Sequence, residues 1–139
     1  MSNSLVVLGF LRTCIDRRFV EGSRKVFQDT VGLAPTAYWH EAYAGGSARD
    51  PSLIENDPKT GNNIYADEYA AKHGAFYFGW QAHIDECGGL PDASNTEIEN
   101  ALDAHINEMI KKYPDKQHYR ILASVEKIVI EQVWPKTEF

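Results

Sequence analysis

The sequence predicts an α/β fold, with one domain built on a mainly parallel central sheet of about four strands flanked by helices. Short apolar runs with strand-like composition alternate with segments of helical periodicity, and this order is typical of parallel sheets. A length of 139 residues suits one domain with a real core. No internal repeat or low-complexity tract divides the chain, so we expect a single domain over 1–139.

Composition narrows the class of protein. A hydrophobic fraction of 43% and a charged fraction of 24% are typical of soluble globular proteins. The net charge of −6, with scattered lysines and arginines, argues against nucleic acid or an anionic membrane as the partner. No segment reaches the ~18–20 apolar residues that span a bilayer. The first residues lack the basic region and cleavage site of a signal peptide, so we expect a cytoplasmic location.

The first half of the chain is expected to contain two strands and a helix. An apolar run over 4–13 predicts a buried strand, and helically spaced apolar residues over 17–30 predict a helix that ends near Gly32. The segment 36–43 is rich in strand formers and runs into an Ala-Gly-Gly turn. Residues 47–63 carry the density of turn residues expected of a long loop.

The second half continues the alternation of helices and strands. A short helix is expected over 65–73 and a strand over 75–82. The clearest helix follows, because it carries one apolar stripe and ends at Pro114. This stripe consists of Ile98, Leu102, Ile106 and Ile110. A last strand is expected over 119–130, either parallel to its neighbour or antiparallel at an edge.

The first group of candidate site residues lies just past the first expected strand. Cys14, Asp16 and Arg18 form the motif Cys-x-Asp-x-Arg. A thiolate is a preferred zinc ligand, and Arg18 can hold the Asp16 carboxylate by a charge-assisted pair, aimed at the metal or its water. Taken alone, the motif favours a structural interpretation, with a buried cysteine followed by charges that compensate a helix dipole.

A second group follows the expected strand over 75–82. His83 and Cys87 lie at the short loop spacing that zinc accepts, and the two glycines after Cys87 let the main chain approach an ion. Taken alone, the group fits a strand-end histidine beside a glycine turn equally well. Cys14 and Cys87, however, both follow strands whose carboxyl ends meet at one edge of a parallel sheet. The sequence therefore predicts one zinc site, with water or a carboxylate as the fourth ligand.

These motifs resemble those of the β-class carbonic anhydrases. The resemblance runs from about residue 5 to residue 90. It rests on Cys-x-Asp-x-Arg after the first strand, Ala-Gly-Gly after the second, and His followed by Cys-Gly-Gly after the third. In that family the cysteines and histidine bind zinc, and the Asp–Arg pair orients or gates the zinc-bound water. By resemblance, the metal ligands are Cys14, His83 and Cys87, and the catalytic residues are Asp16 and Arg18.

The chain departs from the family pattern at three points. His83-x-x-x-Cys87 replaces the usual His-x-x-Cys, and Ala42-Tyr43 stands where the family has Arg-Asn. Only about 13 residues precede Cys14, where the family carries a helical arm. We therefore expect a divergent, minimal member whose whole length forms one β-carbonic-anhydrase-like domain.

The resemblance implies reversible hydration of carbon dioxide to bicarbonate. Zinc would lower the pKa of bound water toward 7 and supply a hydroxide nucleophile. Asp16 would orient that hydroxide, or would occupy the fourth zinc position until Arg18 draws it away. Similar proteins are dimers, so a homodimer or higher homo-oligomer is expected. Two alternatives stay open: a related zinc hydrolase of carbon disulfide or carbonyl sulfide, and a non-catalytic protein with a structural zinc.

Other polar residues have weaker claims to function. Asp85 and Glu86 can bind a metal, but such carboxylates are more often solvated or interact with a nearby arginine. His40 can shuttle protons beside the Ala-Gly-Gly turn, although a half-buried strand histidine is the more common case. The remaining histidines are expected at the surface or on helix faces: His73, His105 and His118. Two cysteines are too few for a disulfide framework, but a single disulfide between them stays open.

Overall fold

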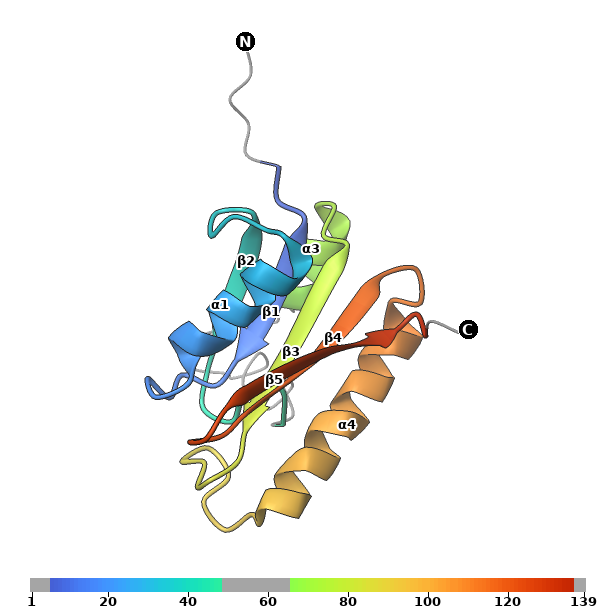
Figure 1. Cartoon of the computed structure of the whole chain (residues 1–139). Helices are drawn as coiled ribbons and strands as arrows, with labels where there is room; N and C mark the ends of the chain where they lie inside the picture. The colour runs from blue at the N-terminus through green and yellow to red at the C-terminus, as the bar shows by residue number, and fades with distance from the viewer. Residues whose placement is uncertain (1–5, 49–65, 137–139) are drawn as a thin grey trace, which may run out of the picture.

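The computed structural model describes residues 6–48 and 66–136 and contains a five-stranded sheet between layers of helix (Figure 1). Its strands are β1 (Gly9–Thr13), β2 (Tyr38–Ala42), β3 (Tyr77–His83), β4 (Gln117–Ala123) and β5 (Ile128–Trp134). Their order across the sheet is β2-β1-β3-β4-β5, with the first four parallel and β5 antiparallel to β4. The expected α/β class with a mainly parallel sheet is confirmed.

Helices cover both faces of this sheet (Figure 1). One face packs against α1 (Val20–Val31), whose Phe27 is fully buried among strand side chains. The other face packs against α3 (Ala66–Lys72) and α4 (Asn95–Lys112). A turn of 3-10 helix, η1 (Gly46–Ala48), follows β2 and contacts α4 and β3. Among the described residues, no helix combines the length and apolar character needed to cross a membrane.

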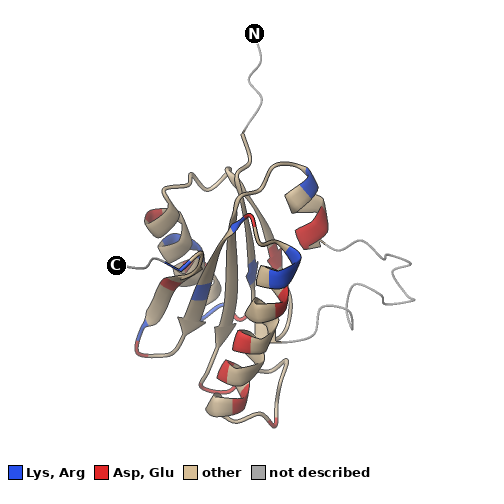
Figure 2. Cartoon of the chain, turned by 90° about the vertical axis from the view of Figure 1, so that its right-hand side faces the viewer, with Lys and Arg blue, Asp and Glu red and all other residues tan. Residues whose placement is uncertain are grey.

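The expected apolar stripe and its end signals account for α4. Ser94 accepts a hydrogen bond from the Glu97 amide, and the Glu97 carboxylate accepts one from the Ser94 amide, so a capping box closes the first turn. Acidic side chains gather toward its start and Lys111 and Lys112 occupy its last turn, which complements the helix dipole (Figure 2). The side chains buried against the sheet are Ile98, Leu102 and Ile106.

The last strand differs from its expected form. Instead of one strand over 119–130, β4 and β5 form an antiparallel hairpin, so the sheet has five strands. Ser124 and Lys127 close the turn, because the Ser124 amide and hydroxyl both donate to the Lys127 carbonyl, at 2.9 and 3.0 Å. The turn contains no glycine or proline, and this explains why the composition gave no sign of it.

The structure bears on the expectations for His118 and for the segment 47–63. His118, expected at the surface or on a helix face, is fully buried on β4, where its Nδ1 accepts a hydrogen bond from Trp80 Nε1 at 3.0 Å. The Trp80 partner lies on the neighbouring strand, so local sequence could not reveal it. The long loop expected over 47–63 falls mostly outside the described residues, and its first two residues belong to η1.

A buried ion network holds β1 in place on the α4 side of the sheet. Arg12, fully buried on β1, donates from Nη2 to Asp67 of α3 at 2.9 Å and from Nε to Glu41 of β2. Asp67 is also buried and accepts hydrogen bonds from Lys112 and from the Tyr113 hydroxyl at the end of α4. Both charges are therefore paired, as burial requires. The network ties one strand end to three other elements.

Candidate metal centre

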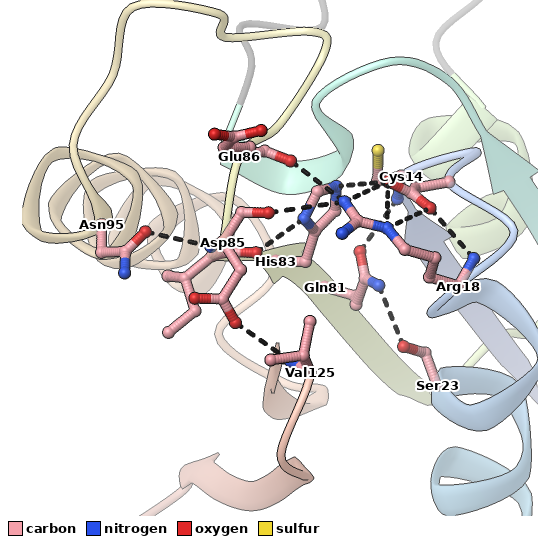
Figure 3. A network of polar contacts seen from close by, with 11 residues as sticks. Cys14, Arg18, Ser23, Gln81, His83, Asp85, Glu86, Asn95 and Val125 are labelled. Atoms are coloured by element: carbon pink, nitrogen blue, oxygen red, sulfur yellow. Dashed lines mark hydrogen bonds and ion pairs between the residues drawn. The ribbon is translucent and has the colours of Figure 1, made fainter.

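The loops that follow β1 and β3 meet at the carboxyl end of the sheet and bring Cys14, His83 and Cys87 together. Figure 3 shows Cys14 and His83 from these two segments side by side. The two sulfur atoms and a ring nitrogen lie within 4.8 Å of one another, and all three side chains are buried. Among the described residues, this is the one group of three or more His, Cys, Asp or Glu side chains with such a geometry. The two segments expected to converge do so.

The imidazole of His83 leaves one nitrogen without a well-formed hydrogen bond. Its Nδ1 lies 3.0 Å from the Ile84 carbonyl, which can only accept, so Nδ1 carries the proton in the neutral ring. Nε2 is buried beside Cys14 and 3.6 Å from Asp16 Oδ2, and among the described residues it makes no hydrogen bond of good geometry. Phe19 packs on the ring with its centroid at 4.6 Å. A buried Nε2 beside two sulfurs fits a metal ligand whose other nitrogen is fixed by a carbonyl.

The two thiols share a proton unequally. A hydrogen bond from Cys87 lowers the pKa of Cys14 to about 4, and the main-chain amides of Asp16 and Gly45 act in the same direction. The same contact raises the pKa of Cys87, and burial adds to this rise. At neutral pH, the pair therefore holds one thiolate and one thiol. A bound cation would favour the second thiolate, because zinc binds cysteine in its deprotonated form.

The Asp16 carboxylate faces this cluster, and Arg18 binds the same carboxylate. Arg18 Nη2 lies 2.8 Å from Asp16 Oδ2, and Nε lies 3.2 Å from both carboxylate oxygens. These bonds lower the pKa of Asp16 to about 2, so the carboxylate is ionised at neutral pH. Its Oδ2 lies 3.6 Å from His83 Nε2. The expected Asp–Arg pair is thus formed and lies beside the three candidate ligands.

The extra residue between His83 and Cys87 is accommodated by an unusual main chain. Asp85 and Glu86 both have a φ of 65°, in the left-handed region that favours glycine. Arg18 Nη2 donates to their carbonyls, at 3.4 and 3.1 Å. The Asp85 amide donates to Asn95 Oδ1, and its carboxylate accepts from the Val125 amide, both at 3.0 Å (Figure 3). Neither acidic side chain joins the ligand cluster.

Two glycines let main-chain segments pack closely beside the cluster, Gly46 against Cys14 and Gly89 against Gly45. A methyl group at Gly46 would lie 2.6 Å from the Cys14 nitrogen, and one at Gly89 would lie 2.4 Å from the Gly45 nitrogen. Both separations are too short for any side chain. The turn after β2 and the loop after Cys87 therefore pack main chain against main chain around the cluster. This gives a physical reason for the Ala-Gly-Gly and Cys-Gly-Gly sequences.

His40 has the half-buried strand environment expected for it. Its Nε2 lies 2.8 Å from the hydroxyl of Thr13, the residue before Cys14. Burial lowers the pKa of His40, and Arg24 lowers it further. A neutral ring at neutral pH follows. Its role in proton transfer stays a prediction.

The chain matches no protein-family model and no curated protein sequence. Its structure does match solved structures. A tetrameric β-carbonic anhydrase from the filamentous ascomycete Sordaria macrospora aligns over 97% of this chain and 84% of that one, with a TM-score of 0.53 and 10% identity. The β-carbonic anhydrase CcaA aligns over 96% of this chain and 80% of that one, with a TM-score of 0.55 and 12% identity.

The chain has a β-carbonic anhydrase fold. At 10–12% identity, the likeness establishes the fold alone. The fold implied by the sequence motifs is thereby confirmed.

Sequence reasoning missed two residues whose side chains bind the main chain of the cluster. Gln81 is fully buried in β3, two residues before His83, and contacts the main chain of Cys14. Asn95, at the start of α4, holds the loop between His83 and Cys87. The sequence did carry a signal for Gln81, because a polar glutamine between Trp80 and an alanine is unusual in an otherwise apolar strand.

The left-handed loop yields a test of stability. Glu86 is exposed, and Glu86→Gly and Glu86→Ala both lose its charge interaction with Arg18, so relief of the strained φ should make Glu86→Gly more stable than Glu86→Ala by about 1 kcal/mol. Glu86→Ala keeps the Cβ and should give no such gain. Urea unfolding of metal-free protein measures both. Equal stability of the two variants would contradict a strained conformation at Glu86.

Proposed function

We propose that this protein binds one zinc ion through Cys14, His83 and Cys87 and catalyses the reversible hydration of carbon dioxide to bicarbonate. The observation that carries the proposal is the buried Cys-His-Cys cluster with an arginine-held carboxylate beside it. The β-carbonic anhydrase fold supports it, because proteins named as such enzymes share this architecture. The carboxyl end of a parallel sheet is also the usual place for an active site.

The donor set fits zinc in particular. Thiolates and imidazole are the ligands that zinc prefers, whereas magnesium and calcium take oxygen ligands. The low pKa of Cys14 provides one of these donors as a thiolate, and His83 presents its Nε2 toward the same cluster. Three protein ligands leave one position of a tetrahedral site open, as in catalytic rather than structural zinc sites.

When bound, zinc would lower the pKa of coordinated water toward 7 and so supply a nucleophile at neutral pH. Asp16 is ionised, and its Oδ2 faces the cluster 3.6 Å from His83 Nε2, so it would accept a hydrogen bond from that nucleophile. Such a bond would orient a lone pair of the nucleophile toward carbon dioxide. Arg18 keeps Asp16 at this distance, because its Nε and Nη2 both bind the carboxylate.

The Asp–Arg pair is expected to act in turnover more than in metal binding. Asp16→Asn should retain most of the zinc but lower carbon dioxide hydration by about 10²-fold or more, a size typical of losing a positioned proton-handling group. Arg18→Ala should act similarly by releasing Asp16. Asp103→Asn is the matched control, because Asp103 pairs with Arg120 on the surface, outside the cluster. Stopped-flow hydration with zinc quantified in each protein provides the measurement.

The same experiment separates the alternatives. A zinc-loaded wild type with no hydration activity at neutral and mildly alkaline pH would contradict the enzymatic proposal and favour a structural zinc. Full activity in Asp16→Asn would remove the Asp–Arg pair from the mechanism while leaving the metal site intact.

We also expect the chain to form homo-oligomers. β5 is an edge strand with Val129 44% exposed, and the fungal neighbour is described as tetrameric. A lysine at an edge strand opposes pairing with a second copy, so Val129→Lys should lower the average molar mass. Val6→Lys, at an exposed position outside the sheet, should not. Light scattering at tens of micromolar tests this, and a monomeric wild type would contradict it.

A further inference from the structure

We propose that Gln81 is a positioning residue for the metal ligand Cys14, and that Ser23 anchors the Gln81 amide. The inference rests on the proposed zinc site, and it assigns a role to two fully buried polar residues that the mechanism above does not use. Gln81 lies on β3 and Ser23 lies on α1, and the Gln81 side chain lies between Cys14 and Ser23 (Figure 3).

The need for Gln81 arises where two strands separate. Pairing between β1 and β3 runs from Gly9 opposite Tyr77 to Arg12 opposite Trp80 and then stops. Gly46 lies beside the gap, since a methyl group there would lie 2.6 Å from both the Cys14 nitrogen and the Gln81 carbonyl oxygen. The Cys14 amide instead donates to the side-chain Oε1 of Gln81, at 2.9 Å.

The Cys14 N–H decides which end of the Gln81 amide faces it, and Ser23 anchors the other end. Gln81 Nε2 donates to Ser23 Oγ at 2.9 Å. A main-chain N–H can only donate, so a flipped Gln81 amide would set two donors against each other at Cys14. In the orientation that the Cys14 N–H selects, the Ser23 hydroxyl on α1 accepts from Nε2 and anchors the far end of the amide. Both side chains are fully buried, so bulk solvent does not compete for this hydrogen bond.

The residues on either side of Cys14 are held by a different element. The Thr13 carbonyl accepts from the Tyr43 amide at 3.1 Å, and the Ile15 amide donates to the Tyr43 carbonyl at 3.2 Å. Cys14 itself is held from the opposite side by Gln81. Only one torsion separates the main chain from Sγ, so the position of this backbone sets the position of the sulfur. Removing the Gln81 acceptor would leave a buried N–H unsatisfied and let the ligand move.

The primary test substitutes Gln81 by methionine, which keeps the length of the side chain and removes the acceptor. Gln81→Met should weaken zinc binding by about 10- to 100-fold, the usual effect of losing a partner that orients a ligand. It should also shift the thiolate-to-cobalt absorption of the Co²⁺-substituted protein, because that band reports the geometry of the sulfur. Gln117→Met is the matched control, since Gln117 accepts from Tyr119 on β4 and should change neither measurement.

A second variant tests whether Ser23 acts through Gln81. Ser23→Ala should weaken zinc binding in the same direction but less, because the acceptor remains while its anchor is lost. In the double variant, Ser23→Ala should add nothing to the effect of Gln81→Met, since the amide it anchors is gone. Chelator competition with zinc gives the affinities, and circular dichroism shows that each variant folds.

Each outcome decides the proposal. Wild-type zinc affinity with an unchanged cobalt spectrum in Gln81→Met would overturn it, as would fully additive effects in the double variant. If Gln81→Met does not fold, Ser23→Ala decides: weaker binding with a shifted spectrum supports the proposal, and wild-type behaviour overturns it. A wild type that binds zinc without hydrating carbon dioxide would remove the proposed function alone, whereas one that binds neither zinc nor cobalt would remove both.

Discussion

The candidate metal centre depends on the separation of β1 from β3 after Arg12, where the pairing of the two strands stops. The main chain of Gly46 lies beside both strands at this point. Pairing that continued past Arg12 would leave Cys14 within the sheet, whereas the gap directs it toward His83 and Cys87. Only a residue without a side chain allows so close an approach. The buried ion network around Arg12 fixes β1 just before it leaves β3.

One guanidinium joins the two halves of the site. Arg18 binds the Asp16 carboxylate and also the carbonyls of Asp85 and Glu86, which lie between His83 and Cys87. The orientation of the carboxylate and the shape of the ligand loop are thus set by the same side chain. The longer His–Cys spacing of this chain is therefore compatible with a closed cluster. The extra residue is absorbed as left-handed main chain and held by hydrogen bonds from Arg18 and Asn95.

Local patterns predicted those parts of the structure that local chemistry determines. The apolar stripe and Pro114 predicted α4, and residue types at two strand ends predicted the cluster. The partners across the fold were not predictable in this way. Arg12 can be buried because Glu41 and Asp67 pair with it, and these partners lie 29 and 55 residues away in sequence. Gln81 likewise contacts Cys14 across 67 residues. The β4–β5 turn was missed because hydrogen bonds of Ser124, rather than glycine, close it.

X-ray absorption at the zinc edge tests the central claim most directly, because it reports the atoms bound to the metal. We expect about one zinc per chain, with two sulfur ligands at about 2.3 Å and nitrogen or oxygen ligands at about 2.0 Å. Cys14→Ser and Cys87→Ser should each lose one sulfur or the metal. Zinc bound without sulfur ligands, or protein prepared without chelators that holds no zinc, would contradict the assignment of Cys14, His83 and Cys87 as a metal centre.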